Sequence, residues 1–112
     1  MNVFHDLLYI FKSMIKKDKL SLLRKKRNLI KIRKNIDNID LKILKLLSLR
    51  RKEVVKITKL KTKKEIIDKK RINSMLKNLV YKGKILNIEP FIVLKIWKAM
   101  ISSFIKFEKN KI

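Results

Sequence analysis

The sequence has no cysteine, one glycine, one proline and one histidine among its 112 residues. Without cysteine the chain can form neither a disulfide nor a thiolate metal site, and His5 alone cannot build a histidine cluster. So few glycines and prolines leave too little turn chemistry for a β-sandwich or a barrel. We therefore predict an all-α protein that binds no metal ion.

Acidic residues are also scarce, nine against 32 basic ones, and the net charge is +23. Such a charge favours nucleic acid or an anionic membrane surface as a partner. The basic residues are mostly lysine and are spread along the chain, as a general bias toward Lys, Ile and Asn would also produce. With 46% hydrophobic residues the chain should fold. We expect no specific nucleic-acid partner, and a basic helical nucleic-acid-binding protein is the non-enzymatic alternative.

Apolar residues recur at helical spacing from the start of the chain. Residues 3–15 carry one apolar stripe, which indicates either a packing surface or a helix on a membrane surface, and Asp18 or Ser21 can cap the next helix. Residues 22–61 continue the spacing without Gly or Pro, which predicts one very long helix. At about 1.5 Å per residue this helix would span roughly 60 Å, too long for one small domain to cover. The sequence therefore predicts a homodimer.

Two further helices are expected. Asp68 is a good N-cap for a second helix that Gly83 would end. Asn87 can cap a third helix with Pro90 in its first turn. The buried face of this helix is expected along Phe91, Leu94, Trp97, Ile101, Phe104 and Ile105. The fold prediction is thus three helices with one very long first helix, in an intertwined helical homodimer.

The apolar runs and the start of the chain indicate in which cellular compartment the protein is expected. Lys95 and Lys98 interrupt the longest apolar candidate, 91–107, so no run approaches the roughly 18 residues of a membrane span. The apolar start lacks the basic leader and the small-residue cleavage site of a secretory signal. We expect a cytoplasmic protein without a membrane span. Residues 1–25 are predicted to be an N-terminal amphipathic extension, and residues 26–112 the helical domain.

Three cations on the long predicted helix could bind an anion. Arg50 and Lys61 are eleven residues apart, about 20° past three full turns, so both project from one face. Arg33 lies seventeen residues before Arg50, roughly 25 Å away along the axis. It can therefore join the other two only from another subunit.

These residues stand in a frame that resembles the all-helical chorismate mutases. The resemblance to the long first helix of that family rests on residues 32–40, with the pairs Ile36-Asp37 and Ile39-Asp40, and on Arg50, Arg51 and Lys61. The second-helix signature, an Asp with an Arg three residues on, matches Asp68 and Arg71. The resemblance covers about residues 29–108. It implies a chorismate mutase that forms prephenate in aromatic amino-acid (Phe and Tyr) biosynthesis, with no cofactor.

The resemblance also implies the roles of individual residues. The small dicarboxylate substrate would lie among Arg33 of one subunit and Arg50, Lys61 and Arg71 of the other, and Lys61 would be the leading catalytic residue. Asp68 would orient the substrate, cap its helix, or both. Glu108 stands where the family commonly has Gln. It can donate a hydrogen bond to the substrate's ether oxygen only when protonated, so we predict that activity rises on acidification.

Two positions depart from the mutase pattern. Ile72 follows Arg71 where mutases usually have Glu, and Phe104 stands in place of a small hydroxyl residue unless a one-residue shift brings Ser103 there. Both departures resemble the isochorismate pyruvate lyase branch of the family, which forms salicylate and pyruvate. The alternatives are therefore this lyase, with isochorismate as substrate, or a family member kept as a regulatory or structural partner.

Overall fold

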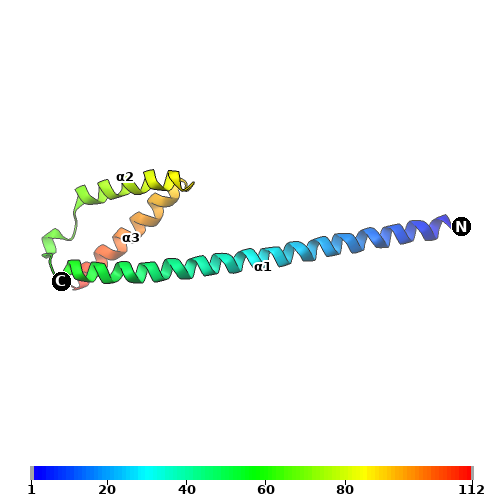
Figure 1. Cartoon of the computed structure of the whole chain (residues 1–112), viewed down its shortest axis with the longest axis horizontal. Helices are drawn as coiled ribbons and strands as arrows, with labels where there is room; N and C mark the ends of the chain where they lie inside the picture. The colour runs from blue at the N-terminus through cyan, green and yellow to red at the C-terminus, as the bar shows by residue number, and fades with distance from the viewer. Residues whose placement is uncertain (1, 112) are drawn as a thin grey trace. The chain divides into compact units, whose positions relative to one another are not determined.

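Three α-helices and one short 3-10 helix make up the protein, which is described by a computed structural model covering residues 2–111. In chain order they are α1 (Val3–Thr58), η1 (Lys63–Glu65), α2 (Lys69–Ile85) and α3 (Pro90–Lys111) (Figure 1). No strand occurs within the described residues. The predictions of an all-α fold, of three helices and of one very long first helix are confirmed.

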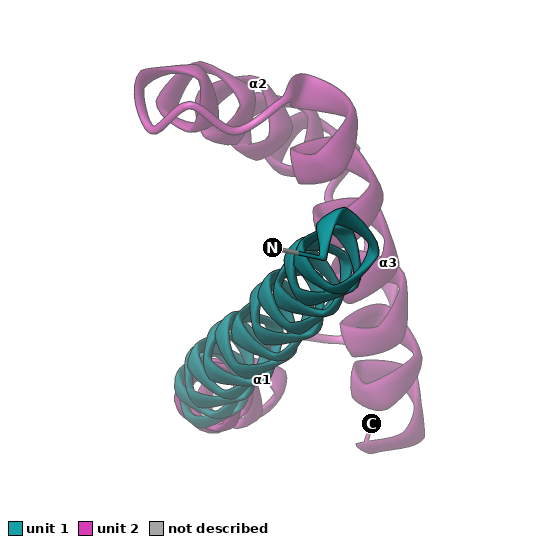
Figure 2. Cartoon of the chain, turned by 90° about the vertical axis from the view of Figure 1, so that its right-hand side faces the viewer, with its two compact units in different colours: residues 1–45 teal, residues 46–112 magenta. Residues whose placement is uncertain are grey.

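The chain divides into two units (Figure 2). The N-terminal unit, residues 1–45, is formed by α1 alone, and the C-terminal unit, residues 46–112, contains the end of α1 with η1, α2 and α3. The predicted domain boundary after residue 25 stays a prediction. No helix in the described part of the chain is long and apolar enough to cross a membrane.

Helix α1 is continuous where the sequence predicted a break. Asn2 caps its start, because the side-chain Oδ1 accepts a hydrogen bond from the backbone N–H of Phe4 at 3.1 Å. Asp18 and Ser21, expected to cap a new helix, lie inside α1 and are exposed. Without Gly or Pro nearby, two such residues weaken a helix by only about 0.5–0.7 kcal/mol each, which does not interrupt it. The helix ends at Thr58, three residues before the predicted Lys61.

The start of α2 agrees with its prediction and its end does not. The Asp68 side chain accepts a hydrogen bond from the backbone N–H of Arg71 at 3.0 Å, which confirms the N-cap. Gly83, predicted to end the helix, is buried inside it. A Cβ at this position would lie 2.8 Å from Cγ2 of Val93. The glycine therefore lets α2 approach α3 closely.

Asn87 ends α2, although it was predicted to cap α3. Its φ of 61° places it in the left-handed region. The backbone N–H of Ile88 donates to the Gly83 carbonyl at 2.8 Å, and that of Asn87 donates to the Lys84 carbonyl at 3.1 Å. This pair of bonds is a Schellman motif, which satisfies carbonyls at the end of the helix. Pro90 then begins α3, as predicted.

Few side chains are buried. The buried hydrophobic residues are Val54, Ile66, Val93 and Ile101. Ile66 is only 4% exposed although it lies in a stretch that reads as polar, because it packs against the helices of its unit. Phe91, predicted to begin the buried face of α3, is 64% exposed, so that prediction is wrong at this position.

Candidate active site

A cavity of about 110 Å³ lies in the C-terminal unit, among residues from the end of α1, α2 and α3. Its polar lining consists of Arg50, Lys61, Asp68, Arg71 and Glu108. Phe104 also lines it, so every predicted site residue except Arg33 lies at this one cavity. At roughly 10–15 Å³ per water molecule, the cavity has room for several waters or a small organic ligand.

Arg50 is the most perturbed residue of the site. Burial lowers the pKa of its guanidinium below the ordinary value, nearby Glu108 opposes that shift, and nearby Arg71 adds to it. The guanidinium nevertheless remains charged at neutral pH. Its Nη1 is buried and has no hydrogen-bond partner among the described residues. A buried donor without a partner is costly, so it is a natural contact point for an anionic ligand.

Aromatic side chains of α3 hold the arginines of α1. The guanidinium carbon of Arg50 lies 4.4 Å from the ring centre of Phe104, and that of Arg51 lies 4.8 Å from the ring centre of Phe107. The two rings themselves meet edge to face, with centres 6.3 Å apart and planes at 82°. These cation–π contacts fix the end of α1 on α3 and orient Arg50 at the cavity wall.

Ser103 does not replace the missing hydroxyl at position 104. Its Oγ donates a hydrogen bond to the Ala99 carbonyl of the same helix at 2.8 Å, and the residue is exposed. Ser103 is not among the residues that line the cavity, whereas Phe104 is. The aromatic ring therefore occupies the place on α3 that the resemblance assigned to a hydroxyl.

Lys61 reaches the cavity from a different backbone than the sequence implied. It follows the end of α1 and is not helical, so the predicted helical projection from Arg50 does not extend to it. It is half-buried and still lines the cavity. Glu108 is 7% exposed, which makes it a buried residue of α3. Both residues therefore line the same cavity.

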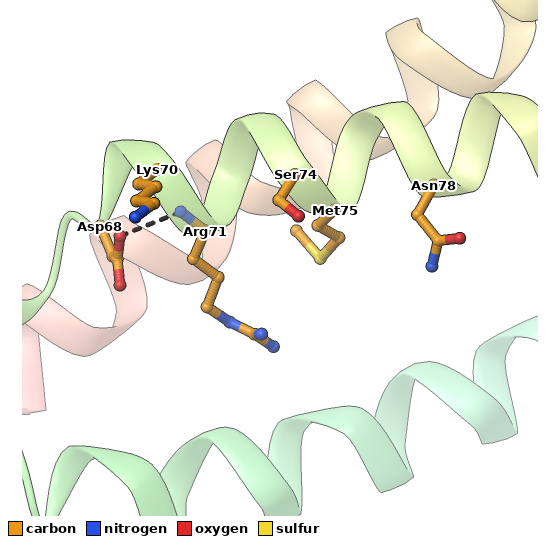
Figure 3. Close-up of a pocket in the computed structure, with 6 residues that line it drawn as sticks. All are labelled: Asp68, Lys70, Arg71, Ser74, Met75 and Asn78. Carbon is orange, nitrogen blue, oxygen red and sulfur yellow. Dashed lines mark hydrogen bonds between the residues drawn. The ribbon is translucent and has the colours of Figure 1, made fainter.

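An open groove of about 650 Å³ runs along the first half of α2 and is lined by Asp68, Lys70, Arg71, Ser74, Met75 and Asn78 (Figure 3). It shares Asp68, Arg71 and Met75 with the cavity, so the two adjoin. The first turn of α2 contains no acidic residue. Lys70 and Arg71 add positive charge to this groove, and the Asp68 carboxylate, which caps the helix end, offsets part of it.

The sequence analysis placed Ile101 on the buried face of its helix, but it did not identify Val54 or Ile66 as part of the site. Val54, Ile66 and Ile101 are buried and line the cavity as its apolar wall. Val54 could have been found, because it lies one helical turn after Arg50 on the same face. Ile66 carried no periodic signal, since it lies in irregular backbone after η1. Arg33 lies in the N-terminal unit, on an exposed part of α1, and does not line the cavity.

An all-α fold with a small cavity walled by apolar residues and lined by cations defines a helical binding site for a compact anion. A sequence model of the chorismate mutase type II family matches residues 32–109, more than two thirds of the chain. The protein therefore belongs to the chorismate mutase type II family, and its function is of the chorismate mutase type, that of an isomerase in aromatic amino-acid biosynthesis. Comparison with curated proteins and with solved structures gave no match.

Proposed function

We propose that the chain rearranges chorismate to prephenate in a pocket completed by a second copy of itself. The observation that supports this most directly is the position of Arg50, Lys61 and Arg71 at one cavity, with Nη1 of Arg50 buried and unpartnered among the described residues. Residues 26–112 would form the catalytic domain and residues 1–25 an accessory extension. We also expect the enzyme to work in the cytoplasm.

The rearrangement is intramolecular, so the site needs no nucleophile and no cofactor. It has to hold the two ends of a flexible dicarboxylate close together and stabilise the charge that develops on the breaking ether oxygen. Arg50, Arg71 and Lys61 line the cavity. In this proposal the two arginines bind carboxylates and Lys61 donates to the ether oxygen. The apolar wall excludes water, which strengthens each of these interactions.

Exposed apolar side chains support the homodimer. In the N-terminal unit the face that includes Arg33 also carries large residues that are 46–55% exposed, namely Leu29, Ile32, Ile36, Ile39 and Ile43. A lone helix in water is marginally stable, so this face requires a partner. A second copy in twofold symmetry would cover it and bring its own Arg33 to the cavity.

Replacing Lys61 tests the chemistry. Lys61→Ala should lower kcat for chorismate by about 10²–10³, the usual effect of losing one donor to a developing negative charge. Lys59→Ala is the matched control, since Lys59 is exposed and does not line the cavity. The rate is followed by the loss of chorismate absorbance. Equal rates for the two variants would contradict the role of Lys61.

Mixing two inactive variants tests the shared pocket. Arg33→Ala and Lys61→Ala each inactivate both sites of a homodimer. A mixed dimer keeps one intact site, because one of its sites combines the unaltered Arg33 of one copy with the unaltered Lys61 of the other. Unfolding and refolding the two together should therefore restore about a quarter of the wild-type activity, because half of the dimers are mixed and each has one intact site of two. If activity does not return although mixed dimers form, Arg33 does not act across the dimer.

Glu108 gives the proposal a test of the donor to the ether oxygen. A carboxyl can donate a hydrogen bond only when protonated, whereas a glutamine amide donates at any pH. Glu108→Gln should therefore raise kcat for chorismate at neutral pH. An unchanged or lower kcat for this variant would contradict a contact between residue 108 and the ether oxygen.

A second candidate reaction has specific support. Ile72 and Phe104 both line the cavity, so the lining includes an apolar side chain and an aromatic one at the two positions where the mutase pattern has Glu and a small hydroxyl. Both features resemble the isochorismate pyruvate lyase branch. Supplying isochorismate and measuring salicylate and pyruvate would distinguish the reactions. Salicylate formation without prephenate formation from chorismate would replace the mutase proposal.

A further inference from the structure

The N-terminal stripe is the apolar face of residues 3–15, which precede the family match at residue 32. Its members are all exposed, each by at least 40%: Val3, Phe4, Leu7, Leu8, Ile10, Phe11, Met14 and Ile15. At about 100° per residue they fall within an arc of about 160°. The stripe is thus a continuous apolar face in a part of the chain that the family match does not cover.

A second copy does not cover the stripe in the pairing that the proposed function requires. Twofold symmetry makes the approach of Arg33 to Arg50 reciprocal, so the two α1 helices must run antiparallel. In that register Thr58, the last residue of α1, lies opposite about residue 25 of the other copy. Residues before about position 25 then extend past the other copy's α1, so that helix does not cover the N-terminal stripe.

Basic side chains border the stripe on both sides. From residue 3 to residue 27 the chain has eight basic residues and only two acidic ones. Lys12 and Lys19 lie about 20–40° beyond one edge of the apolar arc, and Lys17 lies about 20° beyond the other. Lysine stems can run along apolar surface while their ammonium groups stay in water. This arrangement matches acyl chains beneath the stripe and lipid phosphates along its edges.

We infer that the N-terminal stripe of residues 3–15 binds the surface of an anionic membrane as an amphipathic helix that lies in the interface, and that the basic residues up to Arg27 add to its attraction to anionic lipid. The stripe, with Phe4 and Phe11 near its centre, inserts at the boundary between headgroups and acyl chains, and the flanking lysines pair with lipid phosphates. The helix does not span the bilayer, since no helix of the described chain is long and apolar enough. The enzyme would thereby be held peripherally at a membrane.

Sedimentation of the full-length chain with lipid vesicles tests this inference. One vesicle set contains phosphatidylglycerol in phosphatidylcholine, and the other contains phosphatidylcholine alone. Phe4→Ser combined with Phe11→Ser removes apolar area but keeps the net charge of +23. This variant should bind anionic vesicles roughly tenfold more weakly or worse, since two aromatic side chains no longer insert.

Leu20→Ser is the matched control, because Leu20 is 54% exposed and lies about opposite the stripe. This variant should bind anionic vesicles as strongly as the unaltered chain does. Neither of the two proteins should bind neutral vesicles. All variants should retain chorismate turnover, since residues 3–27 do not line the cavity. If the unaltered chain shows no chorismate turnover, the proposed function fails. Vesicle binding is measured separately, so its result tests the membrane inference alone.

Three outcomes would overturn the inference. If the charge of the whole chain alone causes binding, the double variant will bind anionic vesicles as well as the unaltered chain does. If the stripe instead joins copies of the chain, the unaltered protein will form species larger than a dimer without lipid, and the double variant will not. Binding that persists in high salt for both variants would likewise argue against lipid phosphates as the partner.

Discussion

Adding one methyl group at Gly83 should destabilise the contact between α2 and α3. The backbone there is not in the left-handed region, so alanine causes no backbone strain. Its Cβ, however, would lie 2.8 Å from Cγ2 of Val93, a residue that is 3% exposed and cannot swing into solvent. Overpacking of this kind costs about 1–3 kcal/mol, while alanine gains about 1 kcal/mol over glycine inside a helix. The net expectation for Gly83→Ala is a loss of about 0–2 kcal/mol.

A double-mutant cycle separates the two contributions. Val93→Ala removes the methyl group that the new Cβ at position 83 would contact. Gly83→Ala should therefore cost less stability when Val93→Ala is also present, with a coupling free energy of about 1–3 kcal/mol. Stability is measured by urea unfolding, followed by helical circular dichroism at one fixed protein concentration, because the stability of the proposed dimer would depend on concentration. If Gly83→Ala stabilises the protein by the full helix-propensity gain and the two changes are additive, the close approach of α2 to α3 is refuted.

Changes at three further positions test local features. Asp68→Ala should cost about 1 kcal/mol by removing the N-cap, whereas Asp68→Asn should keep that stability and lower chorismate turnover only if the carboxylate orients substrate. Asn87→Gly should stabilise the protein by up to about 1 kcal/mol in the same unfolding assay, since φ is 61° there, and Asn87→Ala should destabilise it. Phe104→Leu should raise KM for chorismate by about two- to thirtyfold by releasing Arg50; an unchanged KM would show that the ring does not position Arg50.

The sequence was sufficient where the signal is local. An N-cap aspartate bonds to a backbone N–H three residues on, so Asp68 could be assigned without any tertiary information. The N-cap is thus decided by neighbouring residues along the chain. The cationic residues Arg50, Lys61 and Arg71 were named together by the resemblance, and the structure brings them to one cavity, although Lys61 is not helical as its spacing had predicted.

Some errors arose because the deciding contact comes from elsewhere in the chain. Gly83 looked like a helix terminator, but Val93 of α3 approaches it so closely that a larger residue would crowd the contact. Asn87 then took the left-handed position that was expected of the glycine. Ile66 lies in a polar-looking stretch and is buried by residues distant in sequence. Asp18 had the chemistry of a cap, yet a cap acts only where a helix begins, and α1 passes through it.

Stability and catalysis in this protein should depend on the same assembly. The C-terminal unit buries few large side chains, while the apolar face of the N-terminal unit is open along residues 29–43. A chain of 112 residues gains little from so small a core, so covering that face contributes much of the folding free energy. The same face includes Arg33, the one predicted site residue that does not line the cavity. Pairing of two copies would therefore bury the exposed apolar residues and supply the missing cation in a single step. In this proposal the dimer is what would allow a chain this basic and this sparsely packed to form an enclosed anion site.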